Sequence, residues 1–136
     1  MDDAVATYRS ASEANDIDVL MTAFADDAAV VSPISGKMVF RGRDDVRHLL
    51  DAVYGTLEDL SWTEPIGSGD RRVLYGECRI GPVRMSDSMV FDLGPDGRIQ
   101  TMRPHLRPWL ALTLFALVLG PKVARRPGVV RRALSG

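Results

Sequence analysis

The segment from Tyr8 to Pro33 predicts two helices followed by a strand, and this order constrains the fold more than any other part of the chain. Asn15-Asp16 interrupts the first helix, and the Asp16 side chain can cap the second. Four apolar residues then follow at helical spacing, so that they share one face: Ile17, Leu20, Met21 and Phe24. The chain therefore begins with a short helical pair that has an apolar side to bury.

We expect Asp26-Asp27 to end the second helix. A short strand should follow from Ala28 to Ser32 and end before Pro33, because a residue that precedes proline is held in an extended conformation.

The first helix, roughly Asp2 to Ala14, is expected to turn Tyr8 inward. The i, i+3, i+4 rule places Val5, Tyr8, Ala11 and Ser12 on one face. Tyr8 should therefore point the same way as the apolar stripe.

After a turn at Ser35-Gly36, a third helix is predicted from about Arg43 to Leu57. Its apolar face consists of Val46, Leu49, Leu50, Val53 and Leu57. From Leu60 onward, turn signals divide the chain into four strand-like runs, joined too tightly for parallel crossovers. Helices followed by an antiparallel meander predict an α+β domain whose bent sheet wraps around the helices.

Asp87 is the least expected residue of the predicted sheet. The strand alternation puts it on the same face as Met85, Met89 and Phe91. Burial among such side chains should raise its pKa. In the last run, Met102, Pro104 and Leu106 continue an apolar inner face.

Composition favours one intracellular domain. The 136 residues are 46% hydrophobic, enough to bury one core. Cys78 is the one cysteine, which excludes an internal disulfide, and the acidic start does not resemble a secretory signal. We therefore expect a cytoplasmic protein. With two histidines and one cysteine we expect no metal site, and we expect no cofactor.

The last part of the chain, 108–136, is expected to add a helix to a domain formed by 1–107. Trp109 to Leu119 is apolar on every side but has half the length of a membrane span. All 18 acidic residues lie at or before Asp96, and eight of the 17 basic residues lie after it. The helix could cover a cavity, form a dimer interface or rest on a membrane surface. We expect a cavity lid or an interface, because the acidic body offers the basic tail a partner.

The segment Ala23-Phe-Ala-Asp-Asp-Ala-Ala-Val-Val-Ser-Pro33 resembles a phrase of the SnoaL-like, nuclear transport factor two-like superfamily, and most closely of its ketosteroid isomerases. The resemblance runs from about Ala4 to Leu106. It implies a cone-shaped fold in which a strongly curved antiparallel sheet encloses the helices.

The same resemblance implies a pocket. Tyr8 and Asp87 match the tyrosine and the protonated aspartate that donate hydrogen bonds to the substrate oxygen in the ketosteroid isomerases. The isomerases carry their aspartate base directly before the proline, and here that position is Ser32. A serine hydroxyl is a poor base, so the resemblance leaves isomerase activity in doubt. Glu77 and Asp92 are the carboxylates that we consider as substitutes.

The ligand is expected to be a hydrophobic molecule of steroid or polyketide type, bound by a homodimeric protein that binds no nucleic acid. The side chains that the pattern and the resemblance place around it are Phe24, Val30, Val53, Met85, Met89, Phe91, Met102, Pro104 and Leu106. Tyr8 and Asp87 could instead form a structural hydrogen bond in a module that binds a ligand or a protein without catalysis. Cyclase, dehydratase or epoxide hydrolase chemistry on the same fold is a further alternative. His48 and His105 are expected to face solvent.

Overall fold

The computed structural model describes residues 3–135. It contains five helices, α1 (Ala4–Glu13), α2 (Ile17–Met21), α3 (Arg43–Tyr54), α4 (Trp109–Val123) and α5 (Pro127–Leu134). The strands are β1 (Phe24–Val31), β2 (Val39–Arg41), β3 (Glu58–Trp62), β4 (Arg71–Ile80), β5 (Val83–Leu93), β6 (Ile99–Arg103) and β7 (Leu106–Arg107).

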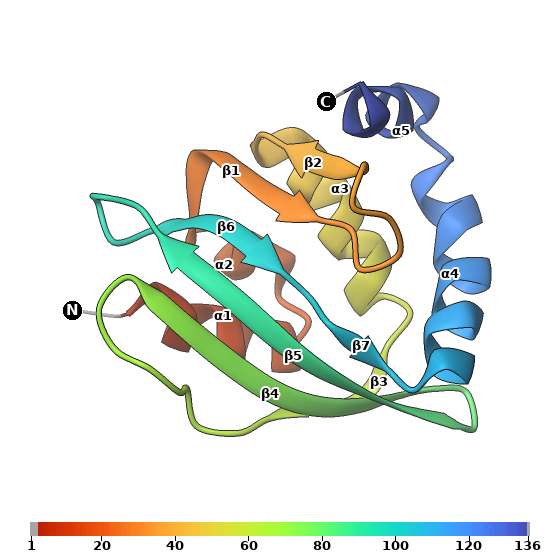
Figure 1. Ribbon diagram of the computed structural model, residues 1–136, viewed down its shortest axis with the longest axis horizontal. Helices are drawn as coiled ribbons and strands as arrows, with labels where there is room; N and C mark the ends of the chain where they lie inside the picture. The colour runs from red at the N-terminus through yellow and green to blue at the C-terminus, as the bar shows by residue number, and fades with distance from the viewer. Residues whose placement is uncertain (1–2, 136) are drawn as a thin grey trace.

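The strands form one sheet in the order β2-β1-β6-β5-β4-β3, and β7 pairs with β5. As predicted, β3, β4, β5 and β6 are joined in antiparallel pairs. However, β1 lies parallel to β6, so the sheet is mixed. Figure 1 shows α1, α2 and α3 behind the sheet, while α4 stands at the end reached by β7 and the β4–β5 hairpin. The α+β prediction is confirmed.

The boundary between α2 and β1 differs from the prediction. The Asp16 side chain caps α2 by accepting a hydrogen bond from the Val19 amide at 3.3 Å, as expected. The helix nevertheless ends at Met21, and the strand begins at Phe24, which pairs with Ile99 of β6. A register shift after Phe24 turns Asp26-Asp27 to solvent within the strand. Sheet pairing therefore overrides the helical spacing of the apolar residues.

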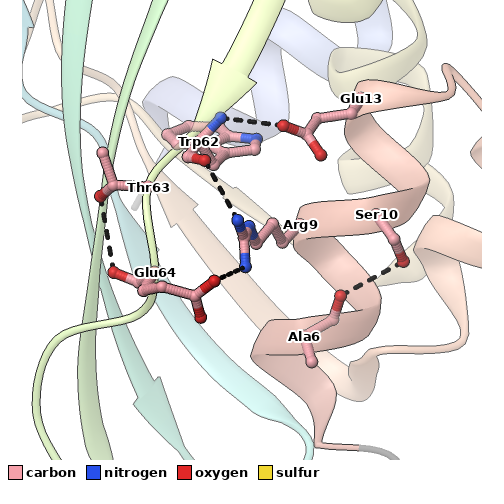
Figure 2. A network of polar contacts seen from close by, with 7 residues as sticks. All are labelled: Ala6, Arg9, Ser10, Glu13, Trp62, Thr63 and Glu64. Atoms are coloured by element: carbon pink, nitrogen blue, oxygen red, sulfur yellow. Dashed lines mark hydrogen bonds and ion pairs between the residues drawn. The ribbon is translucent and has the colours of Figure 1, made fainter.

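Polar contacts attach α1 to Trp62 at the end of β3 (Figure 2). Glu13 accepts a hydrogen bond from the Trp62 amide at 2.9 Å, and Arg9 donates to the Trp62 carbonyl at 3.4 Å. Arg9 also pairs with Glu64 at 3.1 Å. The Trp62 indole donates to the Ser12 hydroxyl at 2.9 Å. This network fixes the position of α1 relative to the sheet.

The C-terminal helices are held by the body of the protein. Arg132 of α5 donates two hydrogen bonds of 2.9 Å to Asp45, which lies in the first turn of α3. Lys122 donates to the Thr56 hydroxyl at 2.7 Å. His48 is half-buried and lies 2.9 Å from the Val123 carbonyl, which corrects the expectation that it faces solvent. His105 is exposed as expected. No helix within residues 3–135 has the length and apolar character needed to cross a membrane.

The close approach of Trp62 to β4 requires a glycine at position 76. A Cβ atom there would lie 2.4 Å from Cε3 of Trp62, whose indole is held by Ser12. We therefore expect Gly76→Ala to lower the free energy of unfolding by about 1–3 kcal/mol, the usual range for overpacking. Urea unfolding followed by circular dichroism measures this change.

Gly36→Ala is the matched control, because a Cβ atom at Gly36 would meet nothing within 4 Å. Its free energy of unfolding should stay within about 0.5 kcal/mol of the native value. Equal stabilities of the two variants would show that Trp62 is not fixed against β4.

Candidate functional site

A cavity of about 320 Å³ lies between the inner face of the sheet, α3 and α4. Most of its lining is aliphatic or aromatic, and its polar groups are few. Among the described residues that line it, Tyr8, Tyr54 and Asp87 bring two hydroxyls and one carboxyl to the same cavity. Such a cavity suits an apolar molecule that carries a hydrogen-bonding group.

Most of the residues expected around a ligand lie on the cavity wall: Val30, Val53, Met85, Met89, Met102, Pro104 and Leu106. Phe24 and Phe91 are fully buried behind Tyr8, with ring centroids 5.9 and 5.0 Å from its ring. They support the tyrosine rather than line the cavity. The wall also includes residues that the sequence analysis did not select, namely Tyr54, Trp62 and Cys78 and the α4 residues Phe115, Leu119 and Val123.

The Tyr8 hydroxyl is hydrogen-bonded to the Tyr54 hydroxyl. Tyr8 comes from α1 and Tyr54 from the last position of α3, so the bond joins two helices. Burial raises the pKa of both phenols, and the nearby Asp87 carboxylate raises them further. Both tyrosines are therefore neutral at physiological pH. One proton bridges the two oxygens, and the second remains free to donate to another acceptor.

The sequence could have indicated that Tyr54 points inward, because this residue lies four positions after Leu50 and therefore on the apolar face of α3.

Asp87 lies on the inner face of β5, between Met85 and Met89, as the alternation predicts. Its Oδ1 accepts a hydrogen bond from the His105 amide at 3.3 Å. Burial raises the pKa of the carboxyl to about 7, although the His105 amide opposes the shift. Near or below that pH the carboxyl is substantially protonated, and it can then donate a hydrogen bond. Burial and the nearby Asp87 charge also raise the pKa of Cys78 to about 11.

The expected base position holds no carboxylate. Ser32 lines the cavity, and its hydroxyl accepts hydrogen bonds from the amides of Ile34 at 3.1 Å and Ser35 at 3.4 Å. Neither substitute that we considered lies on the wall: Asp92 pairs with Arg71 at 2.8 Å, and Glu77 is exposed.

Within the described part of the chain, Asp87 is thus the one acidic residue of the cavity lining. The described residues also contain no group of three or more His, Cys, Asp or Glu side chains arranged to hold a metal ion.

The model of the SnoaL-like domain family matches residues 5–102, which is more than half of the chain. The search of curated proteins gave no significant match. Solved structures with a similar fold include three from bacteria, all of them less than 25% identical to this chain.

An uncharacterized protein with a cystatin-like fold from Silicibacter pomeroyi has a TM-score of 0.88 and 19% identity, with 96% of this chain and 93% of that chain covered. A steroid delta-isomerase from Pseudomonas aeruginosa has a TM-score of 0.76 and 24% identity, with 94% and 93% covered. A candidate polyketide cyclase from Sinorhizobium meliloti has a TM-score of 0.63 and 23% identity, with 77% and 95% covered. At these identities the similarities show the fold, and they confirm the predicted superfamily architecture.

The buried carboxyl predicts a specific dependence of stability on pH. Because the folded pKa of Asp87, about 7, exceeds its ordinary value of 3.8, the folded state keeps a proton that the unfolded chain releases. This contribution to stability is fully present below the unfolded pKa and is lost as pH rises through 7. Asp87→Asn cannot ionise, so its stability relative to the native protein should rise by on the order of 3 kcal/mol between pH 4 and pH 8.

Urea unfolding of the native protein and the Asn variant at several pH values measures this difference. Parallel pH profiles for the two proteins would show that Asp87 has an ordinary pKa.

Proposed function

The chain belongs to the SnoaL-like domain family, and from this premise we propose that its cavity binds an apolar small molecule through an oxygen atom of the ligand. The oxygen accepts one hydrogen bond from protonated Asp87 and one from the Tyr8–Tyr54 pair. Steroid-like and polyketide-like molecules with a carbonyl or phenol group have the required chemistry. The observation that carries the proposal is a buried carboxyl group in an apolar cavity, where burial raises its pKa to about 7.

The contacts of Tyr8 support a ligand-binding role for Asp87. A purely structural role would be favoured by a hydrogen bond between Asp87 and Tyr8, but the Tyr8 hydroxyl bonds to Tyr54. The hydrogen bond from His105 uses Oδ1 of Asp87, so Oδ2 can carry the proton that is donated to a ligand.

The apolar wall and the polar groups have different parts in binding. Removal of apolar ligand surface from water provides most of the binding free energy, at about 25 cal/mol per Å². A hydrogen bond adds only about 0.5–1.5 kcal/mol, but a buried donor left without an acceptor costs about 1–3 kcal/mol. The polar groups therefore select ligands that place an oxygen at Asp87.

Binding of 2-naphthol tests the two donors. Asp87→Asn should keep the dissociation constant within about threefold, because an amide still donates, whereas Asp87→Leu should raise it by roughly tenfold. The Tyr8→Phe, Tyr54→Phe double variant should also weaken binding, because no phenol proton is then left to donate to the ligand. Met89→Leu, which changes the wall without a polar group, is the control.

Isothermal titration calorimetry at pH 6 measures these constants. The native protein should lose affinity as pH rises through 7, since ionised Asp87 no longer donates, and Asp87→Asn should not. Equal affinity in the native protein, Asp87→Leu and the Tyr8→Phe, Tyr54→Phe double variant would contradict the proposal.

Isomerisation of an unsaturated ketosteroid is the second candidate function, and the tyrosine and aspartate donors favour it. The missing element is a general base, whose contribution is typically about 10²–10⁴ in rate. Ser32→Asp should place a carboxylate on the cavity wall, where the amides of Ile34 and Ser35 can orient it.

We expect Ser32→Asp to raise the rate of ketosteroid isomerisation by on the order of 10² or more, measured by the absorbance of the conjugated product. Ser35→Asp also adds a carboxylate to a lining position and serves as the control. If Ser32→Asp binds the steroid without a gain in rate, the cavity is shaped for other chemistry or for binding alone.

A further inference from the structure

Helix α4 has two apolar faces, and the body of the protein covers one of them. Phe115, Leu119 and Val123 are buried and line the cavity. On the outer side, Trp109, Leu110 and Leu117 are 77, 60 and 69% exposed. Figure 1 shows α4 at the margin of the molecule, with no other helix or strand outside it. At helical spacing these three side chains fall on the side of α4 away from its buried residues, and we call this side the outer face of α4.

Exposed arginines lie near both ends of this outer face. Arg107 lies just before α4, and Arg125 and Arg131 lie after it, and all three are exposed. The sequence contains no acidic residue after Asp96, so this part of the chain has a net charge of +8. Among the ion pairs of the described residues, those that involve this C-terminal part are Arg98 with Asp96 and Arg132 with Asp45. Arg107, Arg125 and Arg131 form none of these pairs.

We propose that the outer face of α4 lies on the surface of a membrane that contains anionic lipid. An exposed tryptophan and leucines with cationic residues at both ends of the helix are typical of a segment that lies in the interfacial plane. The 15 residues of α4 extend about 22 Å, which is shorter than the hydrocarbon core of about 30 Å. The helix would therefore lie along the membrane rather than cross it.

Charge disfavours a second copy of the chain as the occupant. A two-fold interface brings the same patch of both copies together. Here it would place Arg107, Arg125 and Arg131 of one copy near the same residues of the other. Anionic lipid headgroups supply the opposite charge instead, while the acyl region accepts Trp109, Leu110 and Leu117.

Membrane contact would place the cavity next to the bilayer. The same helix that faces the lipid forms part of the cavity wall through Phe115 and Leu119. The proposed membrane contact does not depend on the ligand proposed above, because it rests on the outer face of α4 and on the arginines near its ends.

Co-sedimentation with vesicles tests the membrane proposal. We expect the full chain to bind vesicles of phosphatidylcholine mixed with phosphatidylglycerol, and to bind phosphatidylcholine alone much more weakly. Binding should decrease at high salt, because the arginines supply part of it. The fluorescence of Trp109 should shift to shorter wavelength on binding, and Trp109→Phe should remove this shift, since Trp62 is already buried.

Exposed substitutions separate the contributions of charge and apolar surface. Arg125→Ser and Arg131→Ser should each lower the partition coefficient by about fivefold. Leu117→Ser should lower it without changing the melting temperature, because the side chain is 69% exposed. The controls are Arg98→Ser and Ile66→Ser: both positions are exposed, and their turns lie on the side of the molecule away from α4 (Figure 1).

Three outcomes would overturn the proposal. The first is failure of the folded full chain to bind either vesicle. The second is equal loss of binding in the α4 variants and their controls. The third is a dimer, detected by light scattering, that Leu117→Ser dissociates, because the outer face would then bind a second copy.

Discussion

The side chain of Tyr8 is the point at which the separate parts of the fold meet. Its ring lies at an edge-to-face angle to four aromatic side chains from β1, α3, β3 and β5: Phe24, Tyr54, Trp62 and Phe91. Its hydroxyl bonds to Tyr54, so α1 and α3 share both an aromatic contact and a polar one. Aromatic pairs of this kind contribute about 0.5–1.5 kcal/mol each beyond their burial. The Tyr8 side chain is thus part of the core and also lines the cavity.

Local patterns predicted much of the fold, and long-range pairing explains the rest. Asp16 capped its helix as expected, and the alternation in β5 correctly placed Met85, Asp87 and Met89 on the inner face. The spacing of the apolar residues gave no sign that Phe24 pairs in parallel with Ile99, 75 positions later in the chain. The prediction therefore extended α2 too far.

The site was only partly visible in the sequence, since neighbours across the cavity have no fixed spacing along the chain. Alternation and resemblance selected Tyr8 and Asp87, and the structure places both on the cavity wall. They did not select Tyr54, although it shares a helix face with Leu50, and they did not anticipate the pairing of Asp45 with Arg132. Ser32 lies at the expected place, with its hydroxyl bonded to backbone amides. The cavity wall thus carries one carboxyl group, and burial raises the pKa of this group to about 7.

The protonation state of Asp87 tests this account most directly. Carbon-13 NMR of protein labelled at the aspartate carboxyl groups, with Asp87→Asn to assign the signal, follows the titration of this residue in the folded protein. The account predicts a midpoint of about 7 for Asp87. A midpoint near the ordinary value of 3.8 would show that the carboxyl is ionised at neutral pH and cannot donate a hydrogen bond to a ligand.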